Sequence, residues 1–146
     1  MLQALRDQVG AWVWPVHRLD RPTAGLVVFA LDAATTALIQ ADMEAGRVRK
    51  TYHALVRGWF PDSLVMDRPL ADEVNGTLRP SLTRAWLVRH YELGLPMGSF
   101  PTARFSLVRL EPETGRFHQL RRHLAGAGHP IVYDTGHGDR HTNHFV

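Results

Sequence analysis

The clearest apolar pattern in the chain is the uninterrupted run Gly25–Leu31, GLVVFAL, which is short and contains β-branched residues. A run of this length and composition is typical of a strand that is buried on both faces. Asp32 follows it directly, and the next residues place Ala34 and Leu38 at helical spacing before Gly46. We therefore expect a buried strand, an N-cap at Asp32, and a helix that stops at Gly46.

Alternating positions along residues 48–57, VRKTYHALVR, predict a second strand with Tyr52, Ala54 and Val56 on one side. Residues 58–80 are rich in Pro, Asp, Asn and Gly, and predict a long connection. Turns are expected in it at Pro61–Asp62 and Asn75–Gly76.

Two further strands are expected at residues 82–91 and 103–110, and a helix within 116–128. The buried face of that helix would carry Phe117, Leu120 and Leu124, at positions i, i+3 and i+7. A last short strand is expected at IVYD, residues 131–134. This order of elements predicts an α+β fold, with a mixed but mainly antiparallel sheet and flanking helices, in a single domain over residues 1–146.

Composition excludes several classes of protein. Apolar residues make up 45% and charged residues 21%, as in an average globular domain. Cysteine is absent, so disulfides, thiol nucleophiles and thiolate metal sites are excluded. The longest apolar run is too short to cross a membrane, and Arg6 and Asp7 interrupt the region where a signal peptide would be apolar. We expect a cytoplasmic monomer with no membrane or protein partner.

The basic residues are almost all arginine: of 17 basic residues only Lys50 is a lysine, and the net charge is +3. Because the planar guanidinium binds phosphate and stacks on bases, nucleic acid is a reasonable partner. A genome rich in G and C would give the same bias, so composition alone leaves both explanations open.

The first candidate for chemistry is Asp20, in HRLDRPTAG at residues 17–25. Pro22 and Gly25 indicate a shaped loop, and Arg18 and Arg21 flank the carboxylate. Positive charge on both sides would keep Asp20 ionised, as nucleophilic catalysis requires. On local sequence alone, a structural ion-pair cluster in a turn is the more common explanation.

Two other segments carry candidate side chains. Tyr52 could stack on a base, although a tyrosine on a strand more often packs in a core. The segment ETGRFHQLRRH concentrates hydrogen-bond donors on one short helix, which suits RNA phosphates but also suits a solvated basic face. A metal-dependent hydrolase is a weaker alternative, because the tail histidines match no standard ligand spacing: His129, His137, His141 and His144. We expect no metal.

Taken in order, four segments resemble the RluA family of pseudouridine synthases: HRLDRPTAG, KTY followed by ALVRG, ETGRFHQLRRHLAGAGHPI, and YDTGHGDRHTNHF. The likeness spans residues 16–145. The middle and the tail look most like the tRNA pseudouridine synthase C branch, which modifies uridine 65 of tRNA. The resemblance implies the pseudouridine synthase fold and a reaction that needs no cofactor.

The resemblance also implies roles for single residues. Asp20 falls on the catalytic aspartate, Tyr52 on the tyrosine that packs against the target uracil, and Arg121 on the arginine that pairs with the aspartate. Arg18 matches the arginine that fills the gap left by the flipped base, and Leu120 lines the base pocket. The remaining candidates for RNA binding are Arg21, Arg116, His118, Gln119 and Arg122.

The chain also departs from the family pattern. A Lys-Pro-x-Gly element ahead of HRLD and a closing strand after the tail are missing, so we expect a fold truncated at both ends, with exposed strand edges. Ala24 replaces a common serine, and Tyr133 replaces a glycine, whose backbone freedom it lacks. Two alternatives stay open: a synthase of the same family acting on ribosomal RNA, and a non-catalytic RNA-binding fragment.

Overall fold

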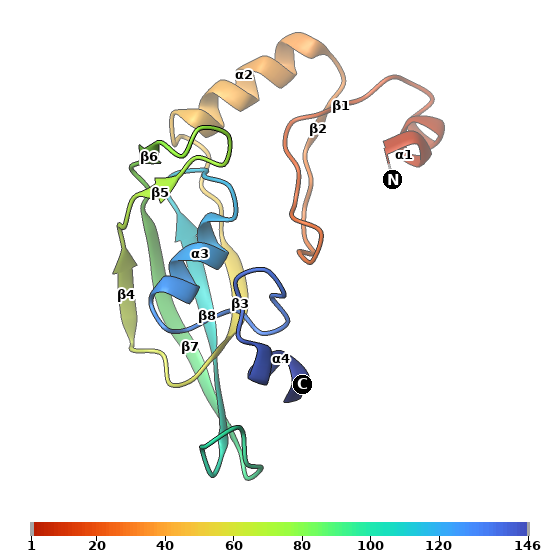
Figure 1. Ribbon diagram of the computed structural model, residues 1–146. Coiled ribbons are helices and arrows are strands. Elements are labelled where there is room, and N and C mark those ends of the chain that lie inside the picture. Colours follow the sequence, from red (N-terminus) through yellow and green to blue (C-terminus); the bar gives the residue numbers. More distant parts are fainter. Residues whose placement is uncertain (1, 146) are drawn as a thin grey trace. The chain divides into compact units, whose positions relative to one another are not determined.

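The computed structural model describes residues 2–145, apart from the side chains of His141 and Phe145. Between residues 48 and 49 the chain divides into two compact units. The first unit contains helix α1 (Leu2–Val9), the two-residue strands β1 (Trp14–Pro15) and β2 (Phe29–Ala30), and helix α2 (Ala33–Glu44), all visible in Figure 1. Strands β1 and β2 are antiparallel.

Helix α2 begins and ends as its sequence predicts. The carboxylate of Asp32 accepts a 2.6 Å hydrogen bond from the backbone N–H of Thr35, as an N-cap does. At the other end Gly46 takes a φ of +72°, a conformation that glycine adopts without steric cost. The expected apolar face is wrong, however, because Thr36 is the buried residue of α2 and Leu38 is 69% exposed.

The prediction of a strand buried on both faces over residues 25–31 is also wrong. Only Phe29–Ala30 forms a strand, and the side chain of Leu26 is 91% exposed. Within the described chain, the strand that pairs with this run is β1, which is two residues long. The apolar run therefore has too few backbone hydrogen-bond partners to form a longer strand.

The second unit is built on a four-stranded antiparallel sheet in the order β3-β8-β7-β4. Its strands are β3 (Tyr52–Arg57), β4 (Ser63–Met66), β7 (Thr83–Leu93) and β8 (Ala103–Pro112). A small hairpin of β5 (Leu70–Ala71) and β6 (Leu78–Arg79), and the helices α3 (Gln119–Gly126) and α4 (Arg140–Phe145), complete the unit. The expected α+β fold with an antiparallel sheet is confirmed.

The long connection expected at residues 58–80 is wrong, because β4, β5 and β6 lie within it. Each is only two to four residues long, too short for its alternation to stand out among Pro, Asp and Asn. The expected turn at Asn75–Gly76 is present: Gly76 has a φ of +70° and donates its backbone N–H to the carbonyl of Asp72.

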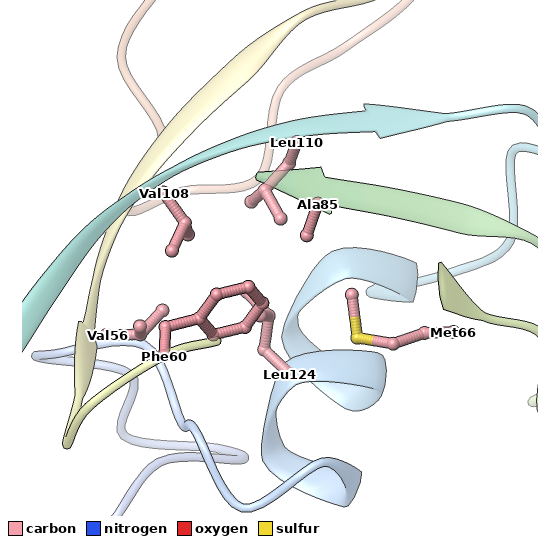
Figure 2. Close-up of a cluster of buried hydrophobic side chains, with 7 residues drawn as sticks. All are labelled: Val56, Phe60, Met66, Ala85, Val108, Leu110 and Leu124. Atoms are coloured by element: carbon pink, nitrogen blue, oxygen red, sulfur yellow. The ribbon is translucent and has the colours of Figure 1, made fainter. Parts of the chain in front are cut away.

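One face of the sheet and helix α3 enclose the core, as Figure 2 shows. The buried cluster consists of Val56, Phe60, Met66, Ala85, Val108, Leu110 and Leu124. Leu124 on α3 is completely buried, and truncation of such a leucine to alanine typically costs about 2–5 kcal/mol of unfolding free energy. Packing against this cluster fixes α3 across the sheet.

Helix α3 begins later than its sequence predicts. It starts at Gln119, and His118 before it has a left-handed φ of +49°. Phe117 therefore lies outside the helix and is 45% exposed, so its expected place on the buried face is wrong. Leu120 and Leu124 do pack on the core.

The segment after α3 extends the sheet at the free edge of β3. The backbone N–H of Arg57 bonds to the carbonyl of Pro130, and that of Val132 bonds to the carbonyl of Leu55. The short strand expected after Pro130 is thus reduced to a single antiparallel bridge between Val56 and Ile131. No helix in the described part of the chain is long and apolar enough to cross a membrane.

Candidate active site

Asp20 lies in the loop that joins β1 to β2 in the first unit. The loop closes through a hydrogen bond from Val16 N–H to the carbonyl of Val28, and Thr23 N–H bonds to the carbonyl of Asp20 itself. Asp20 is half-buried, whereas Arg18 and Arg21 are exposed. The tract is therefore the shaped turn that its Pro and Gly residues indicate.

In the second unit, Arg121 on α3 forms a side-on ion pair with Asp134. Its Nε donates to Oδ2 at 2.8 Å and its Nη2 donates to Oδ1 at 2.7 Å. Side-chain exposure is 14% for Arg121 and 4% for Asp134. Such a two-point bond fixes the plane of the guanidinium as well as its position.

The surroundings of Asp134 keep it ionised. Burial by itself would raise the pKa of this carboxyl. Hydrogen bonds from Arg121 and from the backbone N–H groups of His137 and Gly136 outweigh the burial, and together they hold the pKa well below its usual range. Arg121 therefore faces a permanent negative charge at neutral pH.

Glycines make room for this pair. A β-carbon at Gly136 would stand 2.9 Å from Nη2 of Arg121, and one at Gly138 would overlap the backbone oxygen of Asp134. The turn between them is closed by Gly138 N–H bonding to that same oxygen at 2.8 Å. Gly136 and Gly138 therefore leave room for the ion pair between Arg121 and Asp134 and for the turn that carries Asp134.

Tyr52 and Leu120 lie on the same core cluster, one at the start of β3 and the other on α3. Tyr52 pairs with Leu110 in the sheet, so its side chain is on the face that α3 covers. It is half-buried, as is Leu120, whose neighbour in sequence is Arg121. A planar ring and an apolar side chain therefore border the same core, and the anchored Arg121 directly follows one of them in sequence.

Buried polar bonds fasten α3 to β7. The amide of Gln119 donates to the carbonyl of Leu82 and to the hydroxyl of Thr83, and accepts from the hydroxyl of Thr114 and from Arg116 N–H. Gln119 is 4% exposed, so a direct RNA contact would require these bonds to break. The geometry therefore gives Gln119 a structural role.

A second buried residue of α3, His123, also forms hydrogen bonds to the segments around the helix. His123 is hydrogen-bonded through Nδ1 to Thr83 and through Nε2 to Ser81 and the carbonyl of Arg68. Since a carbonyl only accepts, the proton of the neutral ring is assigned to Nε2. Burial lowers the pKa of His123, which favours this neutral form.

The other expected RNA-binding residues of the second unit lie around α3. Arg122 donates to the carbonyl of Ala71 at 2.9 Å, and exposed Arg116 donates to the carbonyl of Pro80 at 3.1 Å. His118 contacts His137, with Nδ1 and Nε2 separated by 3.0 Å. Within the residues that the structure describes, no group of three or more histidine and acidic side chains is placed to hold a metal ion, and the side chain of His141 lies outside them.

The structure thus places Tyr52 and Leu120 on one core cluster, with Arg121 next to Leu120 on α3, while Asp20, Arg18 and Arg21 belong to the first unit. Asp134 is a residue that the sequence reasoning missed. The sequence Asp-Thr-Gly does indicate a turn, in which the carboxylate accepts N–H groups two and three residues later. Nothing local indicates its bond to Arg121.

Comparison with known proteins agrees with this fold. The sequence profile of the family described as RNA pseudouridylate synthase matches residues 3–126. Tyr52, Arg121 and Asp20 all lie within that match, and Asp134 lies beyond it.

Individual relatives are similar over nearly the whole chain. The tRNA pseudouridine synthase C of Salmonella typhimurium is 41% identical over 153 residues, which cover 98% of this chain and 59% of that protein. The protein of the same name from Vibrio cholerae is 42% identical over 149 residues, 95% of this chain and 61% of that one. The chain spans about three fifths of the length of these relatives.

Two solved human structures have the same fold. RNA pseudouridylate synthase domain containing 1 gives a TM-score of 0.77 at 29% identity, with 93% of this chain and 59% of that one covered. RNA pseudouridylate synthase domain containing 4 gives a TM-score of 0.72 at 23% identity, with 97% and 58% covered.

Proposed function

Because the chain belongs to the RNA pseudouridylate synthase family, we propose that it isomerises a uridine of tRNA to pseudouridine, with Asp20 as the catalytic aspartate. The relatives named tRNA pseudouridine synthase C support tRNA as the substrate. The finer proposal, from the resemblance of the tail and the middle of the chain, is uridine 65.

The observation that carries the proposal is that Tyr52 and Leu120 pack on one core cluster, and that Arg121, next to Leu120 on α3, is anchored by Asp134. Tyr52 can stack on a uracil and Leu120 can line its pocket. The positive charge of Arg121, which Asp134 holds in place, can also attract a second carboxylate. Asp20 is the carboxylate proposed for that position.

The reaction breaks the bond between N1 of uracil and C1′ of the ribose and forms a bond from C5 to C1′. The proton on C5 is lost and N1 gains one, so atoms and electrons balance without a cofactor. A base inside a stem must first be extruded, at a cost of a few kcal/mol. Stacking on Tyr52, insertion of Arg18 into the vacated space, and phosphate contacts by exposed arginines such as Arg21 and Arg116 would offset that cost.

The test is incubation of the protein with unmodified tRNA and ribosomal RNA transcripts, followed by mapping of pseudouridine. We expect product in tRNA from the wild type and none from Asp20→Asn, with RNA affinity largely retained. Asp7→Asn is the matched control, since Asp7 is an exposed carboxylate of the same unit. Turnover by Asp20→Asn would refute the assigned role, and product only in ribosomal RNA would favour the related substrate.

A further inference from the structure

The sheet of the second unit has an outer face, opposite to the one covered by α3, that is rich in arginine and aromatic side chains. Cross-strand register identifies its members, because paired residues point to the same side of a sheet. Its central part comprises Arg84, Trp86, Arg89 and Tyr91 on β7, Leu107 and Arg109 on β8, His53 and Leu55 on β3, and Val65 on β4.

A β-bulge in β7 aligns the key side chains of this face. Leu87 pairs with Val108, and the next paired residue is Arg89, opposite Leu107, so Val88 is the extra residue. Without the bulge, Arg89 and Tyr91 would point to the side of α3. With it, Arg84, Trp86, Arg89 and Tyr91 follow one another along the same side of the strand. We call these four residues and Arg109 the outer row.

Guanidinium groups lie over rings in the outer row. The guanidinium carbon of Arg109 is 4.4 Å from the ring centroid of Trp86, and that of Arg89 is 5.4 Å from the centroid of Tyr91. Arg84, Arg89 and Arg109 are exposed, and Tyr91 is 40% exposed. The row therefore presents planar cations and rings to solvent in alternation.

Charge on this surface is positive. Arg84 is hydrogen-bonded to Glu113, and Arg109 is 3.7 Å from Glu111, so two of the arginines have acidic neighbours. Arg89 forms no ion pair with any residue that the structure describes. Three arginines against two glutamates leave a net positive charge.

We propose that the outer row binds the RNA substrate away from the target nucleotide, with its arginines on backbone phosphates and Trp86 and Tyr91 stacking on bases. A protein partner would have to desolvate three arginines, which is costly unless each meets an acidic group. RNA supplies phosphates and flat bases together, the two chemistries that the row displays. The choice of RNA as occupant rests on the proposed function.

Two double variants test the electrostatic part with the same loss of charge. Arg89→Ala/Arg109→Ala removes two positive charges from the outer row, and Arg47→Ala/Arg79→Ala removes two exposed ones elsewhere, in the first unit and on β6. Binding to unmodified tRNA transcript is measured by filter retention over a range of salt concentrations, after thermal melts have shown that both variants are folded.

We expect the outer-row double variant to bind about tenfold more weakly. Its dependence of log K on log salt should become shallower by roughly 2, because each arginine removed leaves one phosphate with its counterion. The control double variant should change the affinity less than about twofold, because neither of its arginines belongs to the outer row. Wild-type binding by the outer-row variant, or an equal weakening in both variants, would overturn the proposal.

The stacking part has its own test at Tyr91. Tyr91→Ala should weaken binding at least about fivefold, since stacking on an aromatic side chain contributes roughly 1–3 kcal/mol per base. Tyr91→Phe should restore it, because the ring is retained. Equal affinity of the Ala and Phe variants would overturn the stacking role.

The two proposals fail separately. If the wild type forms no pseudouridine in any RNA while the outer-row variant still loses RNA affinity, the RNA-binding role of the outer row is supported and the proposed function is refuted. If the wild type forms pseudouridine and the outer-row variant binds and modifies RNA like the wild type, only the RNA-binding role of the outer row is refuted.

Discussion

Arg121 and Asp134 are joined side-on by two hydrogen bonds, of 2.8 and 2.7 Å, across thirteen positions of sequence. The arginine comes from a helix packed on the core, and the aspartate comes from a turn that its own backbone N–H groups close. Neither side chain has much freedom, so the guanidinium is held in place before any substrate arrives. Preorganised charge of this kind is what a catalytic site uses to stabilise a second anion.

Asp134→Asn removes the charge of this pair while keeping its shape. We expect unfolding free energy to fall by about 2 kcal/mol, because hydrogen bonds to charged groups contribute roughly that much, and pseudouridine formation to slow as Arg121 loses its anchor. Urea unfolding and single-turnover assays measure the two effects. Asp62→Asn, at an exposed carboxylate, should stay within about 0.5 kcal/mol of the wild type. A double-mutant cycle of Asp134→Asn with Arg121→Met should give a coupling free energy of at least about 1 kcal/mol. Additive losses of stability would contradict a direct interaction between the two side chains.

Gly136→Ala and Gly138→Ala should separate activity from stability. The new β-carbon at Gly136 meets the end of the Arg121 side chain, which can move, so activity should fall with little loss of stability. The one at Gly138 meets the backbone of Asp134, which cannot move without opening the turn, so Tm should fall. Thermal melts and turnover of both variants, beside Gly94→Ala where a β-carbon meets open space, provide the test. The reverse order of effects would be inconsistent with this geometry.

Tyr133→Gly should stabilise the protein. Tyr133 has a φ of +64°, in the left-handed region, where a side chain costs roughly 1–2 kcal/mol. Part of this gain is offset by the greater freedom of glycine in the unfolded chain, so we expect a net rise of about 1 kcal/mol in unfolding free energy. Tyr91→Gly, within a strand, should instead destabilise. No gain at position 133 would mean that the ring makes compensating contacts.

Stability should fall as pH falls from about 7 to 5.5, and His123 should be one cause. Burial lowers the pKa of this ring in the folded state, whereas the unfolded chain keeps a value near 6.5. Below about pH 6.5 the unfolded state therefore binds a proton that the folded state excludes, and unfolding free energy declines. His123→Gln should flatten this dependence in urea titrations, even though the variant is less stable throughout. An unchanged slope in His123→Gln would contradict this role of His123.

Some features were predictable because the responsible forces act within a few residues. The Asp32 cap needs only Thr35, three positions later, and the turn before Gly76 needs only Asp72. The side of β3 on which Tyr52 lies follows from simple alternation, and the register with β8 confirms it. Such features can be predicted from sequence wherever local geometry decides the outcome.

Other features depended on partners far along the chain. Residues 25–31 have the composition of a buried strand, but the length of a strand is set by its neighbour, and β1 is two residues long. Phe117 has the spacing for the buried face of α3, but the left-handed turn at His118 starts the helix after it. Asp134 could be recognised as a turn residue, while its bond to Arg121 required the folded tail. Tertiary contacts decided each case.

Strands β7 and β8 stay paired as far as Leu93 and Ala103, beyond Phe105, where the pairing with β3 ends, and Figure 1 shows them continuing as a two-stranded arm. As far as the structure describes the chain, each strand of the arm pairs only with the other, and the buried residues there belong to a separate small cluster of Met97, Ala103 and Phe105. Hydrogen exchange should accordingly be fast in the arm and slow at its base. The arm is also where insertions and deletions would be tolerated, because a change of length there leaves the helix-covered part of the sheet untouched.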